Sequence, residues 1–226
     1  LGGPIGSAIL PRLTRLAAQR DEAGFVRLYR DATQLVAVVT VPVVLVLAFF
    51  PVQVLDAWTG KPDVAGHAAL VLTLYAVGNG ILALAAFPYY LQVARGNLDL
   101  HLAGNLLFVV LFVPLLLLAT MHLGMVGAGY AWVAANLLPF LAWLPIVHRR
   151  FLTGVHLDWL VRDIGAVALA PSLAATLLAH ALTWPSARWE QTLQLLCIGA
   201  GLAALSAAGS SAVRTRLVSI MRESMA

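Results

Sequence analysis

The sequence predicts an all-α protein, a polytopic bundle of transmembrane helices. Of its 226 residues, 61% are hydrophobic and only 11% are charged, whereas soluble domains carry about 25% charged residues. The charges are also sorted into clusters that separate long uncharged runs. A helix needs about 20 apolar residues to cross the hydrocarbon core of a bilayer, and these runs reach that length.

Five uncharged runs determine the number of spans that we expect. They hold 24, 31, 49, 24 and 23 residues and lie between Asp31 and Asp56, Asp63 and Arg95, Asp99 and Arg149, Asp163 and Arg188, and Glu190 and Arg214. The 49-residue run is interrupted at Thr120-Met121-His122-Leu123-Gly124, which predicts two spans there. We therefore expect six full spans, at roughly 32–57, 66–94, 99–121, 124–147, 161–183 and 190–212.

The chain before the first full span has two parts. Leu1–Pro11 is uncharged but too short to cross a bilayer, so we interpret it as the end of a truncated span of a longer protein. Between Arg12 and Asp31, apolar residues recur at near-helical spacing with arginines between them. This pattern predicts an amphipathic helix on the cytoplasmic membrane surface, with a solvated loop as the alternative. We divide the chain into a bundle over 1–150 with four full spans, and two further transmembrane helices with a short tail over 151–226.

The basic residues predict the orientation of the chain. If the segment before the first full span is cytoplasmic, twelve arginines fall on the cytoplasmic side and only Lys61 and Arg188 on the other. Such an excess on cytoplasmic segments is general in membrane proteins. It predicts a cytoplasmic C-terminus. It also accounts for the net charge of +4, so we expect membrane lipids rather than nucleic acid as partners.

The sequence contains two matches to a cofactor-binding motif, but both lie in a structural setting that does not suit it. Gly78-Asn79-Gly80 with Ala83, and Gly199-Ala200-Gly201 with Ala204, match a dinucleotide-binding pattern. Both lie inside apolar spans rather than between a strand and a helix, so we reject them. Cys197 is the single cysteine, and no zinc-ligand spacing or pair of carboxylates occurs within a span. We expect no enzymatic activity, no metal and no cofactor.

Polar residues within the predicted spans are candidates for a substrate pathway. Tyr75, Asn79, Asn105 and Asn136 lie at membrane depth. Polar side chains at such depth often mark a pathway, but asparagines also join neighbouring helices by hydrogen bonds. Both interpretations stay open for the three asparagines.

Several stretches resemble a known transporter family in their order and spacing. They are Leu10-Pro11-Arg12-Leu13, Leu28-Tyr29-Arg30 before a span with Pro42 and Pro51, Gln92-Val93-Ala94-Arg95-Gly96-Asn97, and Gly124-Met125-Val126-Gly127-Ala128-Gly129-Tyr130-Ala131. The last looks like the small-residue pattern G-x-x-G-A-x-x-A of that family. Residues 1–150 are thus similar to the second lobe of the multidrug/oligosaccharidyl-lipid/polysaccharide exporter superfamily, and most to its Wzx-like O-antigen and exopolysaccharide flippases.

The resemblance implies the C-terminal lobe of a two-lobe transporter in the bacterial inner membrane. Such a protein moves undecaprenyl-diphosphate-linked oligosaccharide from the cytoplasmic to the periplasmic leaflet by alternating access, in the biosynthesis of lipopolysaccharide and other polysaccharides. Polysaccharide polymerase machinery is then a further expected partner. Arg30 and Arg95, at the inner mouth, become candidates for contact with the substrate, although setting the orientation of the chain is an alternative role for each.

Three other functions are compatible with the sequence. A cation-coupled multidrug exporter of the same superfamily would favour a carboxylate within the membrane, and the five uncharged runs contain none. A lipid II flippase of the superfamily is a second alternative. A fragment of a membrane glycosyltransferase or polymerase is the third, but the short outer loops argue against it.

Overall fold

The computed structural model describes the backbone of residues 2–224 and the side chains of residues 6–216 and of Ser219. All regular elements in this part of the chain are helices, which confirms the all-α class. In chain order they are α1 (Gly2–Ala18), α2 (Glu22–Phe49), α3 (Pro51–Thr59), α4 (Pro62–Ala85), α5 (Phe87–Ala94), α6 (Asp99–Phe151), α7 (His156–Asp158), the π-helix η1 (Trp159–Gly165), α8 (Ala166–Ala181), α9 (Arg188–Gly209) and α10 (Ser211–Ser224).

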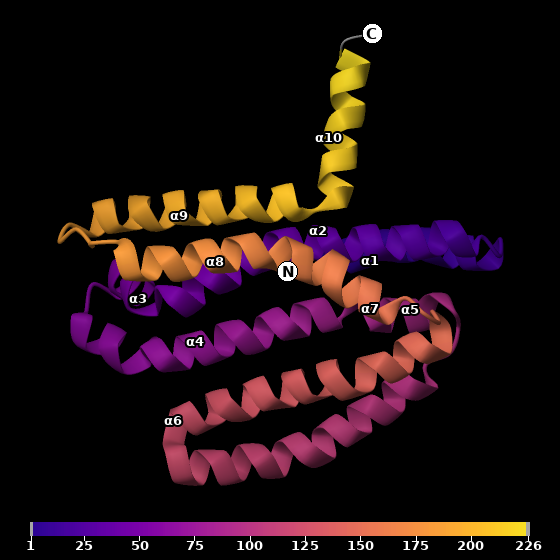
Figure 1. Cartoon of the computed structure of the whole chain (residues 1–226). Helices are drawn as coiled ribbons and strands as arrows, with labels where there is room; N and C mark the ends of the chain where they lie inside the picture. Colours follow the sequence, from indigo (N-terminus) through magenta and orange to yellow (C-terminus); the bar gives the residue numbers. More distant parts are fainter. Residues whose placement is uncertain (1, 225–226) are drawn as a thin grey trace.

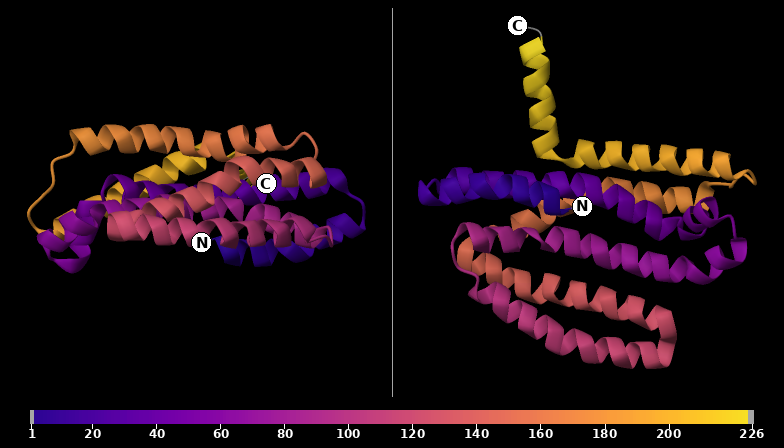
Figure 2. Two further views of the ribbon diagram at one scale, coloured as in Figure 1. Left: turned by 90° about the horizontal axis from the view of Figure 1, so that it is seen from below. Right: turned by 180° about the vertical axis from the view of Figure 1, so that it is seen from behind.

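Among the described residues, five helical segments are long and apolar enough to cross a membrane. They are Glu22–Phe49, Pro62–Ala94, Asp99–Phe151, His156–Ala181 and Arg188–Gly209. The long helices lie side by side in one elongated bundle, and α10 stands away from it (Figures 1 and 2). Each helix pairs its backbone polar groups by hydrogen bonds of its own, as the interior of a bilayer requires.

Helix α2 is the element around which the bundle is arranged. It contacts α1, α4, α8 and α9, and α6 packs on α4 at the edge of the bundle farthest from α9 (Figure 1). The last two long helices, α8 and α9, therefore join the same bundle as the helices of residues 1–150. No separate C-terminal unit is visible in the described residues.

Helix α6 contains a sharp reversal near its middle. Gly124 has φ 58° and ψ −138°, outside any helical conformation, and the two arms of α6 run back along each other (Figure 1). Only glycine adopts such angles readily, because it has no Cβ atom. The reversal falls within the interruption that the sequence predicts at 120–124.

Two of the predicted spans are interrupted where the sequence analysis expects continuous helices. In the first, Phe50 separates α2 from α3, with φ −124° and ψ 42°. Proline at position 51 cannot donate to the preceding turn, and it disfavours the helical conformation of the residue before it. In the second, α4 ends just before Ala86, and α5 begins at Phe87 with proline in its first turn. Pro42, by contrast, lies inside α2 without ending it.

The segment 12–31 differs from the single surface helix that the sequence predicts. Helix α1 continues to Ala18, and α2 begins at Glu22, capped by the Asp21 side chain, which accepts a hydrogen bond from the Gly24 amide at 2.9 Å. Arg20 lies between them at φ 56°. The two helices pack against each other, so the apolar spacing serves a helical hairpin rather than one helix on a surface.

The best-packed core lies at the end of the bundle that holds the α1–α2 turn. Phe25, Tyr29, Phe87 and Trp159 are completely buried there. In contrast, the first arm of α6 exposes large apolar side chains, with Leu106 68% and Met121 79% exposed. Apolar side chains on such a surface are typical of contact with lipid.

Candidate functional site at the basic end of the bundle

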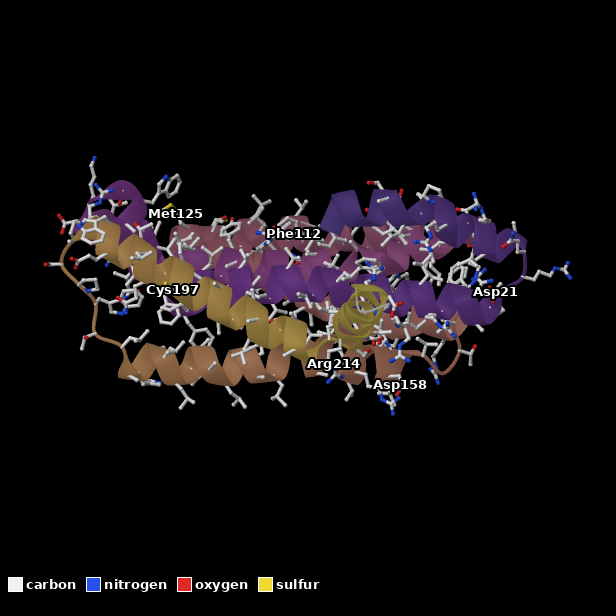
Figure 3. The ribbon with its side chains drawn as sticks, turned by 90° about the horizontal axis from the view of Figure 1, so that it is seen from above. Asp21, Phe112, Met125, Asp158, Cys197 and Arg214 are labelled. Atoms are coloured by element: carbon white, nitrogen blue, oxygen red, sulfur yellow. The ribbon has the colours of Figure 1, made fainter. Side chains whose placement is uncertain are left out.

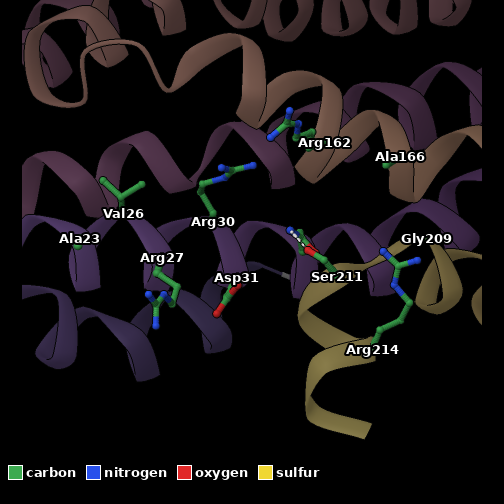
Figure 4. Close-up of a pocket in the computed structure, with 11 residues that line it drawn as sticks. Ala23, Val26, Arg27, Arg30, Asp31, Arg162, Ala166, Gly209, Ser211 and Arg214 are labelled. Carbon is green, nitrogen blue, oxygen red and sulfur yellow. Dashed lines mark hydrogen bonds between the residues drawn. The ribbon is translucent and has the colours of Figure 1, made fainter. Parts of the chain in front are cut away.

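Four arginines gather around one cavity near the end of the bundle that holds the α1–α2 turn. This end is called the basic end below, and its cavity, of about 550 Å³, is called the basic cavity. Arg27 and Arg30 come from α2, Arg162 from η1 and Arg214 from α10 (Figure 4). Asp31 is the one acidic residue among those that line it. Asp158 and Arg214 also mark this region in the view from above (Figure 3).

Arg30 forms the central ion pair of the site with Asp163. Its Nε lies 2.7 Å from Oδ2 of Asp163, and its Nη2 lies 3.1 Å from Oδ1. The Asp163 side chain is completely buried, whereas that of Arg30 is 25% exposed. Such a two-point contact fits the planar guanidinium to the carboxylate and fixes its orientation. Arg30 lines the basic cavity while held by Asp163, and its Nη1 also lies 4.0 Å from Oδ2 of Asp158.

Gln34 extends this pair to the junction of α9 and α10. Its amide nitrogen donates to Oδ1 of Asp163 at 2.7 Å and to the Ser211 hydroxyl at 3.1 Å. Its amide oxygen accepts from the Ser210 hydroxyl at 2.8 Å and from the Ala212 backbone amide at 3.0 Å. Buried polar groups need such partners to offset their loss of water. The Asp163 network, defined as Arg30, Gln34, Asp163, Ser210 and Ser211, thus links three separate parts of the chain.

A second buried set of hydrogen bonds lies beside this network. The Tyr29 hydroxyl is 2.7 Å from Nε2 of His148, and Nδ1 of His148 is 2.8 Å from Nδ1 of His156. The Trp159 indole donates to the Thr33 hydroxyl at 3.0 Å. These contacts join α2 to the end of α6 and to η1. They hold the basic end together behind the cavity.

The π-helical turn η1 brings two buried side chains onto α2. Trp159 and Asp163 are four residues apart, so they lie on nearly the same side of the turn, and both are completely buried. Trp159 contacts Thr33, while Asp163 contacts Arg30 and Gln34. Turns of this type occur often at functional sites, where they re-aim side chains.

Of the two arginines that the sequence analysis proposes, the structure places only Arg30 at the basic cavity. Arg95 instead pairs with Glu22, with Nη1 2.7 Å from Oε1, and its guanidinium lies 4.3 Å from the centre of the Phe25 ring. The hydrogen bond to Glu22 raises the pKa of Arg95. Its contacts attach α5 to the start of α2.

Tyr75 and Asn79 lie together at a second cavity, of about 510 Å³, between α2 and α4. Asn79 donates to the Tyr75 carbonyl on its own helix at 2.7 Å, and the Tyr75 ring stacks on Trp132 at 6.4 Å between centroids. Thr40 also lines this cavity, and its buried hydroxyl has no partner among the described residues. The walls are otherwise apolar.

The other two asparagines lie apart from both cavities. Asn136 is buried and donates to the Trp132 carbonyl one turn earlier at 2.8 Å. Asn105 is exposed, and its amide lies 3.0 Å from Nε2 of His101 on the same helix. Each of these bonds stays within α6. The six predicted site residues are therefore distributed over several places rather than gathered in one.

The sequence analysis missed Asp163 as a buried group. Asp163 lies near the start of the predicted span 161–183, and nothing in its local sequence indicated that its side chain is completely buried. The proximity of Asp163 to a run of apolar residues was visible, but nothing in the sequence pairs it with Arg30, which is 133 residues away.

Long apolar helices and a basic end define the class of protein, an α-helical membrane protein. Among the described residues, no group of three His, Cys, Asp or Glu side chains is placed to hold a metal ion. No family model, curated protein or solved structure matches this chain. Its function is therefore inferred from the fold and the site.

Proposed function

We propose that this chain forms part of a membrane transporter that moves undecaprenyl-diphosphate-linked oligosaccharide from the cytoplasmic to the periplasmic leaflet by alternating access. The observation that carries the proposal is the basic cavity, where four arginines from three helices surround about 550 Å³. The diphosphate is the part common to such substrates. Arginine guanidinium groups bind phosphate oxygens by paired hydrogen bonds.

In this proposal the basic end faces the cytoplasm. The distribution of twelve arginines against Lys61 and Arg188 supports that orientation. Six crossings follow if α2 with α3, α4 with α5, each arm of α6, η1 with α8, and α9 each cross once. The basic cavity then lies near the inner headgroups, where a lipid-linked diphosphate would be met first.

The charges around the cavity divide into two groups with different roles. Arg30 is paired with Asp163 and lies 4.0 Å from Asp158, and Arg162 lies 3.5 Å from the same Asp158. Among the described residues Arg27 and Arg214 form no ion pair, and Asp31 is the acidic group that shares their cavity. We assign Arg27 and Arg214 to attraction of the diphosphate, and Arg30 to a fixed contact at its inner wall.

The test is a pair of genetic measurements in a strain that has no redundant flippase. Deletion of the gene should abolish surface glycan while lipid-linked precursor accumulates inside the cell. The double variant Arg27→Gln with Arg214→Gln should lower surface glycan at least tenfold at unchanged protein level. Arg12→Gln, an exposed arginine on α1 outside the cavity, is the matched control and should retain normal glycan. Normal surface glycan after gene deletion would overturn the proposal.

Asp163 favours one alternative, a cation-coupled multidrug exporter of the same superfamily. A buried carboxylate within an apolar segment is the group that such an exporter would use. Here, however, it already accepts hydrogen bonds from Arg30 and Gln34, so its charge is matched within the protein. For the exporter, gene deletion would lower drug resistance and leave surface glycan intact. If the chain were part of a lipid II flippase, gene deletion would instead make peptidoglycan precursor accumulate.

A further inference from the structure

Helix α10 leaves the bundle in a direction that no other helix takes. At Ser210, which has φ −84° and ψ 120°, the chain turns sharply out of α9. Beyond it α10 extends away from the bundle at a steep angle to α9, as Figure 1 and the right view of Figure 2 show. If α9 crosses a membrane, α10 lies roughly in the plane of that membrane.

The length of α9 places this turn at a membrane surface. Its 22 residues span about 33 Å at 1.5 Å per residue, close to the hydrocarbon thickness of about 30 Å. The exposed Trp189 lies at its start, where an indole is favoured at the opposite interface. Helix α10 therefore begins at the level of the headgroups on the basic side, while α1 and the start of α2 extend beyond it (Figure 1).

The sequence of α10 is that of a basic amphipathic helix. Apolar residues recur in it at three- and four-residue spacing, at Val213, Leu217, Ile220 and Met221, a spacing typical of one apolar helical face. Three arginines and one glutamate lie in the same 14 residues, and the first two arginines, Arg214 and Arg216, are exposed. Helices of this composition lie in the interface of anionic membranes.

The first turn of α10 is attached to the bundle by buried hydrogen bonds. The Ser210 hydroxyl is completely buried, donates to the Gln34 amide oxygen and accepts from the Val213 amide at 3.3 Å. The Ala212 amide donates to the same Gln34 oxygen at 3.0 Å. These bonds satisfy two backbone amides that a helix start leaves without partners. They connect the first turn of α10 to α2 through the Gln34 side chain.

From these observations we infer that α10 is an interfacial helix that binds the anionic lipid surface of the leaflet at the basic end. Arg216 and Arg222 contact lipid phosphates, whereas Arg214 lines the basic cavity, and the apolar face enters the boundary between headgroups and acyl chains. Gln34 transmits this position to Asp163 and Arg30 at the basic cavity. Helix α10 would lie there whatever the bundle transports, so failure of the proposed flippase activity would leave this inference standing.

The experiment places a fluorescent thiol label at two neighbouring positions of α10 in the full chain. Ile220→Cys lies within the apolar spacing and Ser219→Cys outside it, each in a Cys197→Ala background because Cys197 is exposed. The variants are reconstituted in vesicles of phosphatidylcholine with or without 30% phosphatidylglycerol. Quenching by nitroxide-labelled lipid and by aqueous iodide is measured at low and high salt.

We expect lipid quenching at position 220 to exceed that at 219 at least twofold in anionic vesicles, with iodide quenching changed in the opposite sense. Each surface arginine strengthens attachment about fivefold. Arg216→Gln with Arg222→Gln should therefore weaken the attachment of α10 to anionic vesicles about thirtyfold. The labelled helix should then leave the vesicle surface at lower salt. Equal lipid quenching at the two positions with full access of iodide would overturn the inference. So would a signal that depends on protein density rather than on lipid charge, because it would indicate contact with a second copy.

Discussion

Removing Arg30 and removing Asp163 from their ion pair should have different effects on stability, because the two side chains differ in burial. Asp163 is completely buried, and Arg30 is 25% exposed at the basic cavity. Arg30→Met leaves a buried carboxylate with Gln34 as its remaining partner. Breaking a buried pair in this way costs about 3–5 kcal/mol. Asp163→Leu leaves an arginine that can turn to water in the cavity, and hydrogen bonds to a charged group contribute about 1.5–3 kcal/mol.

We therefore expect Arg30→Met to lower the free energy of unfolding more than Asp163→Leu. The double variant should be more stable than Arg30→Met alone, because no uncompensated charge is left buried. The coupling energy between the two positions should reach about 2 kcal/mol. Reversible unfolding in mixed micelles with increasing dodecyl sulfate, followed by circular dichroism, measures these differences for the full chain.

Arg12→Met is the matched control, since Arg12 is exposed on α1, and it should change stability by less than about 0.5 kcal/mol. Two results would refute the reasoning. One is additivity of the single changes within about 0.5 kcal/mol, as for independent sites. The other is a cost of Arg30→Met no larger than that of the control.

Two further predictions concern the fold around the site. Gly124→Ala should lower the free energy of unfolding by about 1–3 kcal/mol, because the backbone angles φ 58° and ψ −138° are unfavourable for a residue with a side chain. Gly201→Ala is the control, since a Cβ atom added there meets open space. In the same unfolding assay it should be neutral or slightly stabilising. Equal effects would contradict a glycine-dependent reversal. His148→Leu should cost about 1–3 kcal/mol because it removes the partner of the buried Tyr29 hydroxyl. His148→Leu should cost less when Tyr29→Phe is already present, because the hydroxyl that needs a partner is then absent. If the effects of the two substitutions on stability simply add, this explanation is excluded.

Much of the architecture could be predicted from local composition. Uncharged runs of sufficient length predict helices that cross a bilayer, because unpaired backbone and charged groups are excluded from it. The interruption at 120–124 likewise predicted the reversal at Gly124. The breaks at Phe50 and Ala86 were harder to predict, since a proline ends a helix at one place and is tolerated inside a helix at others, as Pro42 is in α2.

The candidate site was predicted only in part, because its contacts join residues far apart in the chain. Arg30 and Arg95 became candidates only through the family resemblance, and the structure distinguishes them because Arg95 pairs with Glu22, 73 residues away. Tyr75 and Asn79, which the sequence analysis names separately as polar residues at membrane depth, line the same cavity. That they line a cavity, while Asn105 does not, depends on which neighbouring helix packs against each face.

The sequence by itself determined that this is a helical chain with long apolar segments, charges sorted to their ends, and a glycine at the sharpest reversal. These properties follow from the cost of exposing or burying groups one at a time. The tertiary structure alone decided that Asp163 is buried, that Gln34 holds the start of α10, and that arginines from three helices share one cavity. Each of these depends on pairing between distant residues, and a charge beside an apolar run has the same local pattern whether it meets water or a partner.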